Sequence, residues 1–230
     1  MNKQAKLFSL LAAAMVLITV PAFAGQDQPS PAVREVLQGP GWTKKDNNLH
    51  QVAGPAPGQA AAKAYRLYRS GAPSKETFAK WCTEYGIERV IVMSGDAEDH
   101  EFSYQSQGVC PNLKVVYNLK QTVGEPVSDA FLQWFDDQVA QAKRDQVGVL
   151  FRCKTGSHRT GRLAAYYQMK YEGVNVTDAI AVMNHLGVLM PVFDIPLKPQ
   201  VRALDEFVQG KPCDQKKKAC VAVNSNRYLP

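Results

Sequence analysis

Residues 147–161 read VGVLFRCKTGSHRTG, and this segment carries the clearest evidence of the fold class. Its first five residues, Val147 to Phe151, form a continuous apolar run of strand length, as expected of a central strand covered on both faces. A polar segment with two glycines follows and leads into a helical pattern from about Arg159 to Glu172. A buried strand that turns directly into a helix is typical of an α/β fold with a parallel sheet.

Further strands and helices alternate on both sides of this unit. Strands are predicted over 65–69, 89–93 and 113–117, and helices begin after the cap residue Ser74, at Ser128, at Thr177 as N-cap and at Pro199. The alternation predicts the α/β class, with a mostly parallel central sheet flanked by helices. Because ligands of such sheets bind at the carboxyl ends of the strands, the loop after Phe151 is the place to look for chemistry.

The two ends of the chain differ from its middle. Residues 1–24 combine two lysines, an apolar run of about 14 residues and the segment Ala22-Phe23-Ala24, which predicts a signal peptide and an exported, periplasmic or secreted protein. That run is shorter than the ~20 residues a spanning helix needs, so no stable membrane insertion is expected. Residues 25–62, rich in Pro, Gly, Gln and Ala, predict an irregular N-terminal arm, residues 63–210 a single domain, and residues 211–230 a tail.

Composition narrows the classes of partner. The formal net charge of +6 suits an anionic ligand, but the Lys and Arg residues are scattered, so nucleic acid is not expected as a partner. The four histidines show no metal-ligand spacing, and neither a metal nor another cofactor is expected. The oligomeric state is left open by the sequence.

Five cysteines in an exported chain leave one without a partner. Cys213 and Cys220 could close a small loop in the tail, and Cys82 and Cys110 could form a second bridge, although the sequence does not fix the pairing. Cys153 would then be the free thiol.

The segment from Cys153 to Gly161 has the parts of a phosphate site. A helix that starts near Arg159 presents unpaired N–H groups and the positive end of its dipole, and two glycines let the backbone curl into an anion-binding nest. Arg159 can hold two phosphate oxygens with its planar guanidinium. The same positive surroundings favour Cys153 as the nucleophilic thiolate, and Thr160 can donate its hydroxyl to that sulfur.

This loop resembles the signature of the cysteine-dependent protein tyrosine phosphatase superfamily: a Cys, five residues, an Arg, and then Ser or Thr. YRSGAPS (68–74) and GIERVIVM (86–93) are similar to segments of its dual-specificity-like branch, and the resemblance covers about residues 65–186. It implies a protein tyrosine phosphatase-like fold in residues 63–210, Cys153 as a nucleophile that forms a phosphocysteine, and Arg159 as the phosphate-binding residue. Arg152 stands where the family usually has His, and its charge could likewise lower the thiol pKa.

The resemblance also implies a carboxylic acid on a loop about 30 residues before the nucleophile. KQTVGEPVSD (120–129) offers Glu125 and Asp129 as general-acid candidates, and the choice between them stays open. An acid in the first turn of a helix, as Asp129 is predicted to be, is also an ordinary dipole partner.

Basic and polar groups around the loop bear on the substrate. The cradle is expected to comprise Lys154, Thr155, Gly156, Ser157 and His158, with Lys120 adding a positive group from the acid loop. These side chains resemble those of bacterial tyrosine-phosphatase-like phytases, which implies a phosphorylated small molecule, an inositol polyphosphate, as substrate. A protein tyrosine or dual-specificity phosphatase is the alternative, and a phosphate-binding pseudoenzyme is a third possibility.

Overall fold

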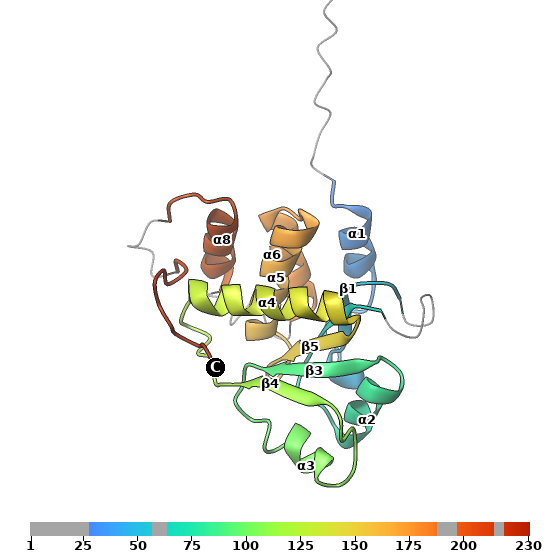
Figure 1. Ribbon diagram of the computed structural model, residues 1–230. Helices are drawn as coiled ribbons and strands as arrows, with labels where there is room; N and C mark the ends of the chain where they lie inside the picture. Colours follow the sequence, from blue (N-terminus) through green and yellow to red (C-terminus); the bar gives the residue numbers. More distant parts are fainter. Residues whose placement is uncertain (1–27, 57–63, 188–196, 214–218) are drawn as a thin grey trace, which may run out of the picture.

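The computed structural model describes residues 28–56, 64–187, 197–213 and 219–230 (Figure 1). Their strands form one sheet in the order β1-β2-β5-β3-β4. The central strand β5 (Gly148–Arg152) pairs in parallel with β2 (Arg66–Ser70) and with β3 (Ile87–Val92), and β3 pairs in parallel with β4 (Lys114–Asn118). The prediction of an α/β fold with a mostly parallel sheet, centred on the run 147–151, is confirmed. The predicted signal peptide, residues 1–24, lies outside the described residues.

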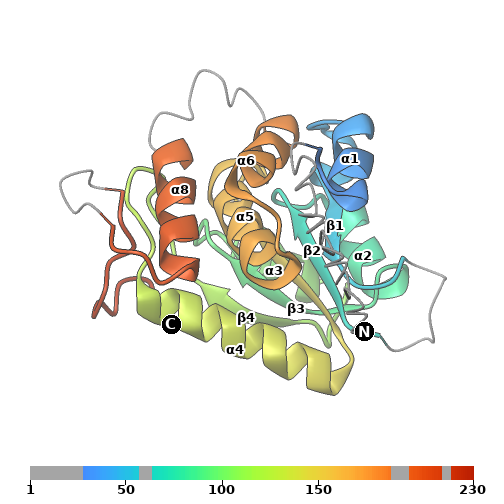
Figure 2. The ribbon, with the colours of Figure 1, turned by 90° about the horizontal axis from the view of Figure 1, so that it is seen from above.

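Helices cover both faces of the sheet (Figures 1 and 2). One face carries α4 (Asp129–Asp145), α5 (His158–Glu172), α6 (Val176–His185) and α8 (Leu197–Val208), and the other carries α2 (Lys75–Thr83) and α3 (Glu101–Gln105). Side chains of one strand alternate between the two layers: Val149 and Phe151 pack against α4 and α5, whereas Leu150 packs in the α2 layer. Because the side-chain layers on both faces of the sheet are apolar, the sequence of β5 is a continuous hydrophobic run.

The expectation of an irregular arm over residues 25–62 was wrong for part of that segment. Pro31–Gln38 forms helix α1, capped by the Ser30 hydroxyl, which accepts from the Val33 N–H at 3.3 Å. His50–Ala53 forms strand β1, which pairs antiparallel with β2 at the sheet edge. A short 3-10 helix, η1, covers Lys45–Asn47. These elements gain their stability from tertiary contacts, such as Val33 against α6, which carry little local sequence signal.

One smaller expectation also needs correction. Helix α6 is capped by Asn175, whose side-chain oxygen accepts from the Asp178 N–H at 2.9 Å, and not by Thr177. Both Asn and Thr can cap a helix. With Asn175 as the cap, the helix begins at Val176, whose side chain packs against the core. The loop after β3, residues 94–100, leads directly into the short helix α3.

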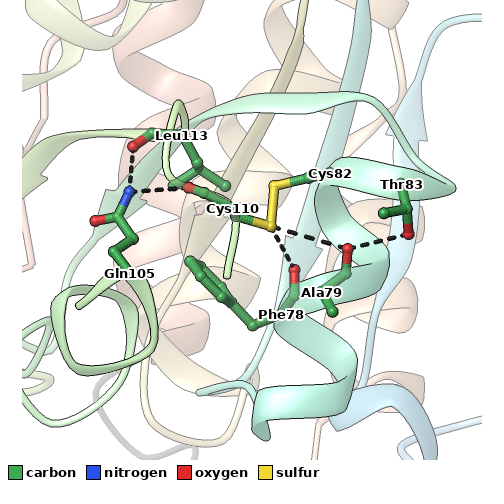
Figure 3. The surroundings of a disulfide bond; sticks show 7 residues. All are labelled: Phe78, Ala79, Cys82, Thr83, Gln105, Cys110 and Leu113. Atoms are coloured by element: carbon green, nitrogen blue, oxygen red, sulfur yellow. Dashed lines mark hydrogen bonds between the residues drawn. A yellow bond between two sulfur atoms is a disulfide. The ribbon is translucent and has the colours of Figure 1, made fainter. Parts of the chain in front are cut away.

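The cysteine pairing follows the sequence expectation. Cys82 in α2 is bonded to Cys110 in the turn before β4, and Cys213 is bonded to Cys220. Figure 3 shows how Gln105 supports the first bridge: its amide donates to the carbonyls of Cys110 and Leu113 at 3.2 and 2.6 Å. Cys153 is the free cysteine and is buried.

The last residues pack against the start of α4. Ser128, the N-cap of α4, forms a parallel bridge with Ala222, and its hydroxyl donates to the Arg227 carbonyl. Val221 joins the core on that face of the sheet. Residues 219–230 therefore belong to the folded domain. Across the described ranges, no helix has both the length and the apolar surface needed to cross a bilayer.

Candidate active site

A tight loop connects the central strand to α5. Cys153 follows the last residue of β5, and α5 begins five residues later at His158. Gly156 has a φ of +70°, and a Cβ there would come within 2.7 Å of the Gly71 backbone nitrogen. Only glycine fits that conformation and that approach. The loop therefore brings residues 153–157 around the N-terminus of α5, where backbone N–H groups and the helix dipole favour an anion.

The Cys153 thiol lies at the bottom of this loop and is 1% exposed. Burial by itself raises the thiol pKa, but the Arg159 charge and hydrogen bonds from the Thr160 hydroxyl and from the N–H groups of Thr160 and Thr155 outweigh it, so the pKa lies below its usual value. The Thr160 hydroxyl is also 3.5 Å from the Ser70 carbonyl, so it donates to whichever acceptor is stronger, which is the sulfur once ionised. The site favours the reactive thiolate.

Arg159 bridges two neighbouring loops. Its Nη1 donates to the carbonyls of Met93 and Gln121, at 2.9 and 3.2 Å, so the guanidinium is held against the loops that follow β3 and β4. Its Nε is buried and has no hydrogen-bond partner among the described residues. A buried donor beside the thiol matches the requirement for a group that binds a phosphate oxygen.

The outer side of the loop is held by donors from distant parts of the chain. The carbonyl of Lys154 accepts from the Ala72 N–H at 3.0 Å, and that of Thr155 accepts from the Trp42 indole at 3.1 Å. The carbonyl of Gly156 accepts from Arg69 Nη2 at 2.5 Å and from the Asn48 amide at 3.4 Å. Since the C=O and the following N–H of a planar peptide point in opposite directions, these contacts turn the loop N–H groups inward.

Sequence reasoning missed three of these donors, Trp42, Asn48 and Arg69. Trp42 and Asn48 belong to the segment expected to be irregular, far from Cys153 in sequence. Arg69 lies within the YRSGAPS motif, so its position was visible in the sequence. Nothing in the sequence, however, indicated that its guanidinium contacts the Cys153 loop.

Arg152 does not replace the missing histidine in a simple way. Its guanidinium is fully buried and pairs with both carboxylate oxygens of Glu101 and with Asp96 at 2.7 Å. Burial lowers the Arg152 pKa, but these two carboxylates more than compensate and the pKa is raised. The positive charge next to the nucleophile is thus neutralised within the protein, and lowering of the thiol pKa has to come from other groups.

The predicted substrate-binding residues lie along the loop with different exposures. Lys154 is exposed, Thr155 and His158 are half-buried, and Gly156 and Ser157 are buried. Burial and the nearby Arg159 lower the pKa of His158, so its ring is neutral at neutral pH. Neutral His158 can therefore offer a hydrogen bond but no charge.

Lys120 lies on the neighbouring loop and is also exposed. A Cβ on Gly95 would come within 2.8 Å of the Lys120 backbone nitrogen, so the loops after β3 and β4 touch there. These two loops are the ones that Arg159 joins, and they border the Cys153 loop at the same edge of the sheet.

The two general-acid candidates both contact the C-terminal segment. Asp129 accepts from the backbone N–H groups of Asn224 and Ser225, at 2.8 and 3.4 Å. Burial raises the Asp129 pKa, but the backbone N–H donors, those of Asn224, Ala130 and Ser225 among them, together lower it by more, so the pKa sits below its usual value. Glu125, on the exposed loop after β4, accepts from the Tyr228 hydroxyl at 2.8 Å.

A cavity of about 230 Å³ opens beside the Cys153 loop. Its walls include Trp42, Lys44, Gly71, Lys154 and Thr155. Two lysines and an indole thus border a space on the outer side of the Cys153 loop. In the same described ranges, no group of three or more His, Cys, Asp and Glu side chains could hold a metal ion.

Comparison with known proteins supports the fold. No family model matches the chain. The structure of PTPMT1 in complex with PI(5)P superposes with a TM-score of 0.50 and 13% identity, over 70% of this chain and 95% of that one. P. aeruginosa TpbA aligns at 23% identity with a TM-score of 0.47, over 72% of this chain and 96% of its own. The architecture described above is thus a protein tyrosine phosphatase-like fold.

One curated protein matches a short stretch. Alanine racemase of Hamiltonella defensa is 35% identical over 72 residues, which is 30% of this chain. The match spans 20% of the racemase, so this chain corresponds to about a fifth of that enzyme's length. The match does not assign racemase activity to the chain.

Proposed function

We propose that the chain is a cysteine-dependent phosphatase that hydrolyses phosphomonoesters through a phosphocysteine intermediate. One observation carries the proposal: Cys153 alone among five cysteines is unpaired, and it is buried at a helix N-terminus with a lowered thiol pKa. A buried structural cysteine in apolar surroundings would have a raised pKa instead. The combination of thiolate, anion-binding loop and arginine serves phosphoryl transfer.

In the first step the Cys153 thiolate attacks phosphorus, the P–S bond forms, and the P–O bond to the substrate breaks. Arg159 and the loop N–H groups hold the oxygens of the phosphoryl group as charge moves onto them. The departing oxygen takes a proton from a carboxylic acid. Glu125 fits this role better than Asp129, because the Asp129 carboxylate already binds two backbone N–H groups of the C-terminal segment.

In the second step water attacks the phosphocysteine and gives its proton to the same carboxylate. The P–S bond breaks, inorganic phosphate leaves, and the electron pair returns to sulfur as the thiolate. The Thr160 hydroxyl stabilises that leaving sulfur by donating to it.

Myo-inositol polyphosphates are the substrate class that we propose. Lys154 and Lys44 border the cavity on the outer side of the loop, and Lys120 is exposed on the adjacent loop, so three cationic side chains are available around the loop for additional phosphates. One monophosphate needs only the loop and Arg159, whereas further phosphates on one ring would need these additional charges. PTPMT1, which shares the fold, was captured with the phosphoinositide PI(5)P.

We also propose that the protein acts outside the cytoplasm. The first 24 residues have the pattern of a signal peptide, and the two disulfides fit a compartment in which cysteines are oxidised.

The test compares turnover of inositol hexakisphosphate with that of a phosphotyrosine peptide by residues 25–230. We expect inorganic phosphate release from the inositol substrate to exceed that from the peptide, and Cys153→Ser to abolish both while retaining substrate binding. Peptide turnover alone would favour a protein tyrosine or dual-specificity phosphatase. A folded wild-type protein inactive on every phosphomonoester would refute the phosphatase proposal.

A further inference from the structure

Arg69 is a fully buried cation that has no carboxylate partner in the part of the chain that the structure describes. It lies in β2 and is 1% exposed, and its only hydrogen bond among the described residues runs from Nη2 to the Gly156 carbonyl at 2.5 Å. Its Nε and Nη1 have no partner there, and no carboxylate lies within ion-pair distance in those ranges. Arg152, buried to the same extent, pairs with two carboxylates.

Such an arrangement needs a compensating charge, because burying an unpaired guanidinium costs several kcal/mol. Burial lowers the Arg69 pKa to about 10, and the Cys153 thiolate is the charged group that opposes this. Arg69 therefore stays charged at neutral pH. The interaction is reciprocal. The thiolate favours the charged guanidinium, and the guanidinium favours the thiolate by the same free energy.

The sheet register explains why these two groups face each other. Arg69 pairs with Phe151 across the parallel β2–β5 ladder. Side chains of directly paired residues point to the same face, and Cys153, two residues after Phe151, continues on that face. Arg66, three residues before Arg69, lies on the opposite face, where its Nε donates to the Pro55 carbonyl.

Arg69 also acts on the loop geometry. By binding the Gly156 carbonyl from outside the loop, it fixes the peptide plane whose N–H belongs to Ser157. The planar peptide then directs that N–H toward the inner side of the loop. Glycine is required at this position, so the contact restrains the most freely rotating residue of the cradle.

We propose that Arg69 is a positioning residue of this site, which orients the Gly156–Ser157 peptide and supplies a buried positive charge, in addition to that of Arg159, that favours the Cys153 thiolate. The inference rests on the proposed phosphatase function for its meaning, but its central claim concerns the thiol alone. Arg152 cannot supply this positive charge, because Asp96 and Glu101 neutralise it. Arg69, on the neighbouring strand β2, supplies it instead.

Other charged groups around the sulfur must be separated from Arg69. Helix α5 contributes Arg159 and Arg162, and β5 contributes Arg152 with its partners Asp96 and Glu101. His50 lies near Arg69 from β1, and burial, Arg69 and His185 lower its pKa to about 4, so it stays neutral throughout the range of interest. His158 beside Arg159 also has a lowered pKa.

The experiment measures the rate of Cys153 alkylation by iodoacetamide between pH 4.5 and 9. The other four cysteines are in disulfides, so the reagent reports on Cys153. Arg69→Gln keeps a donor for the Gly156 carbonyl but removes the charge, and we expect alkylation at pH 6 to slow about tenfold, equivalent to one pKa unit. Arg69→Lys keeps the charge and should stay within about threefold of wild type. Arg66→Gln on the opposite face is the matched control, expected to react like wild type.

An Arg69→Gln profile that superimposes on that of the wild type, in a protein with unchanged thermal unfolding, would overturn the proposal. If that variant does not fold, the ¹⁵Nε resonance of Arg69 in the wild type decides instead: it should titrate with the thiol pKa, and this titration should vanish in Cys153→Ser. A resonance that does not respond to the thiol refutes the pairing. Neither readout needs a substrate, so an inactive wild type would refute the phosphatase and leave this test intact.

Discussion

At Cys153, burial and its surroundings act on one sulfur atom in opposite directions. Burial favours the neutral thiol, whereas Arg159 and the Thr160 hydroxyl favour the thiolate. Because the folded-state pKa lies below that of an unfolded cysteine, ionisation of Cys153 adds stability that is complete above the unfolded pKa and is lost as the pH falls through the folded pKa. Reactivity and stability are therefore coupled through the same proton.

Thr160→Val should slow the second chemical step more than the first. The isosteric change removes the donor that stabilises the departing sulfur, and a hydrogen bond to a charged group contributes about 1.5–3 kcal/mol, so breakdown of the phosphocysteine should fall by roughly 10- to 100-fold. Rapid-quench kinetics should then show a burst of alcohol release followed by a slow steady state. Thr160→Ser, which keeps the hydroxyl, is the control, and equal kinetics in all three proteins would contradict the role.

Glu125→Gln and Asp129→Asn should separate catalysis from structure. Glu125→Gln removes the proposed proton donor, so kcat should fall at least tenfold for substrates with poor leaving groups and little for p-nitrophenyl phosphate, whose leaving group needs no proton.

Asp129→Asn should instead weaken the docking of residues 224 and 225 by about 1 kcal/mol, the usual net contribution of a hydrogen bond. Because the Asp129 pKa is lower in the folded protein, this contribution is complete above the pKa of an unfolded aspartate, about 3.9, and is lost as the pH falls through the folded pKa, so the stability difference between the two proteins should shrink on acidification. Denaturant unfolding at pH 7 and pH 3 measures it. The reverse pattern, with leaving-group dependence in Asp129→Asn, would make Asp129 the acid.

Among the larger elements, the loop after β4 is held from two sides. Arg162 Nη1 donates to the Glu125 carbonyl at 2.7 Å, and the Tyr228 hydroxyl accepts from the Thr122 N–H at 2.9 Å while donating to the Glu125 carboxylate. Helix α5, which carries Arg159, and the C-terminal segment thus fix the same loop. The position of the proposed acid thus depends on Arg162 and Tyr228, 37 and 103 positions away in sequence.

Tyr228→Phe should loosen this loop without disturbing the nucleophile. The change removes both hydrogen bonds of the hydroxyl, so amide exchange of residues 121–126 should accelerate and kcat should fall about threefold to tenfold, by loss of one or two ordinary hydrogen bonds. The alkylation rate of Cys153 should remain that of the wild type. A change in thiol reactivity instead would show that the segment acts on the nucleophile itself.

Elements with local signals were predictable, and those stabilised by distant partners were not. The capped start of α4 at Ser128 and the apolar run of β5 carry their own patterns, and both predictions are confirmed. Strand β1 has half-buried residues throughout and exists because β2 offers it an edge. A period-two or period-3.6 pattern cannot report a partner that lies elsewhere in the chain.

On the scale of the whole molecule, the parts of the site also divide into those with a local sequence signal and those that depend on distant contacts. The order of residues along the Cys153 loop was readable, because nucleophile, glycines and arginine are adjacent in sequence. The environment of Arg69 could not be predicted, since the lack of a carboxylate partner among the described residues is a property of three-dimensional packing. The general acid remained ambiguous for the same reason: both candidates satisfy the spacing, and their contacts with the C-terminal segment appear only in the fold.

The two disulfides should stabilise the molecule without tuning its chemistry. The Cys82–Cys110 bridge spans 28 residues and the Cys213–Cys220 bridge spans 7, so replacing the first pair by Ser should lower the free energy of unfolding by about 2–4 kcal/mol and the second pair by less. Guanidinium unfolding of the two double variants measures both. Their Cys153 alkylation rates should equal that of the wild type, and a slower rate would link a bridge to the site.

With every other cysteine committed to a bridge, Cys153 has no neighbour able to rescue it after attack by peroxide. A sulfenic acid formed there cannot condense with a second thiol of the same chain, so it either meets a small thiol from solution or proceeds to the irreversible sulfinic acid. The lifetime of the protein in a peroxide-rich environment is therefore set by its surroundings and not by a repair route of its own.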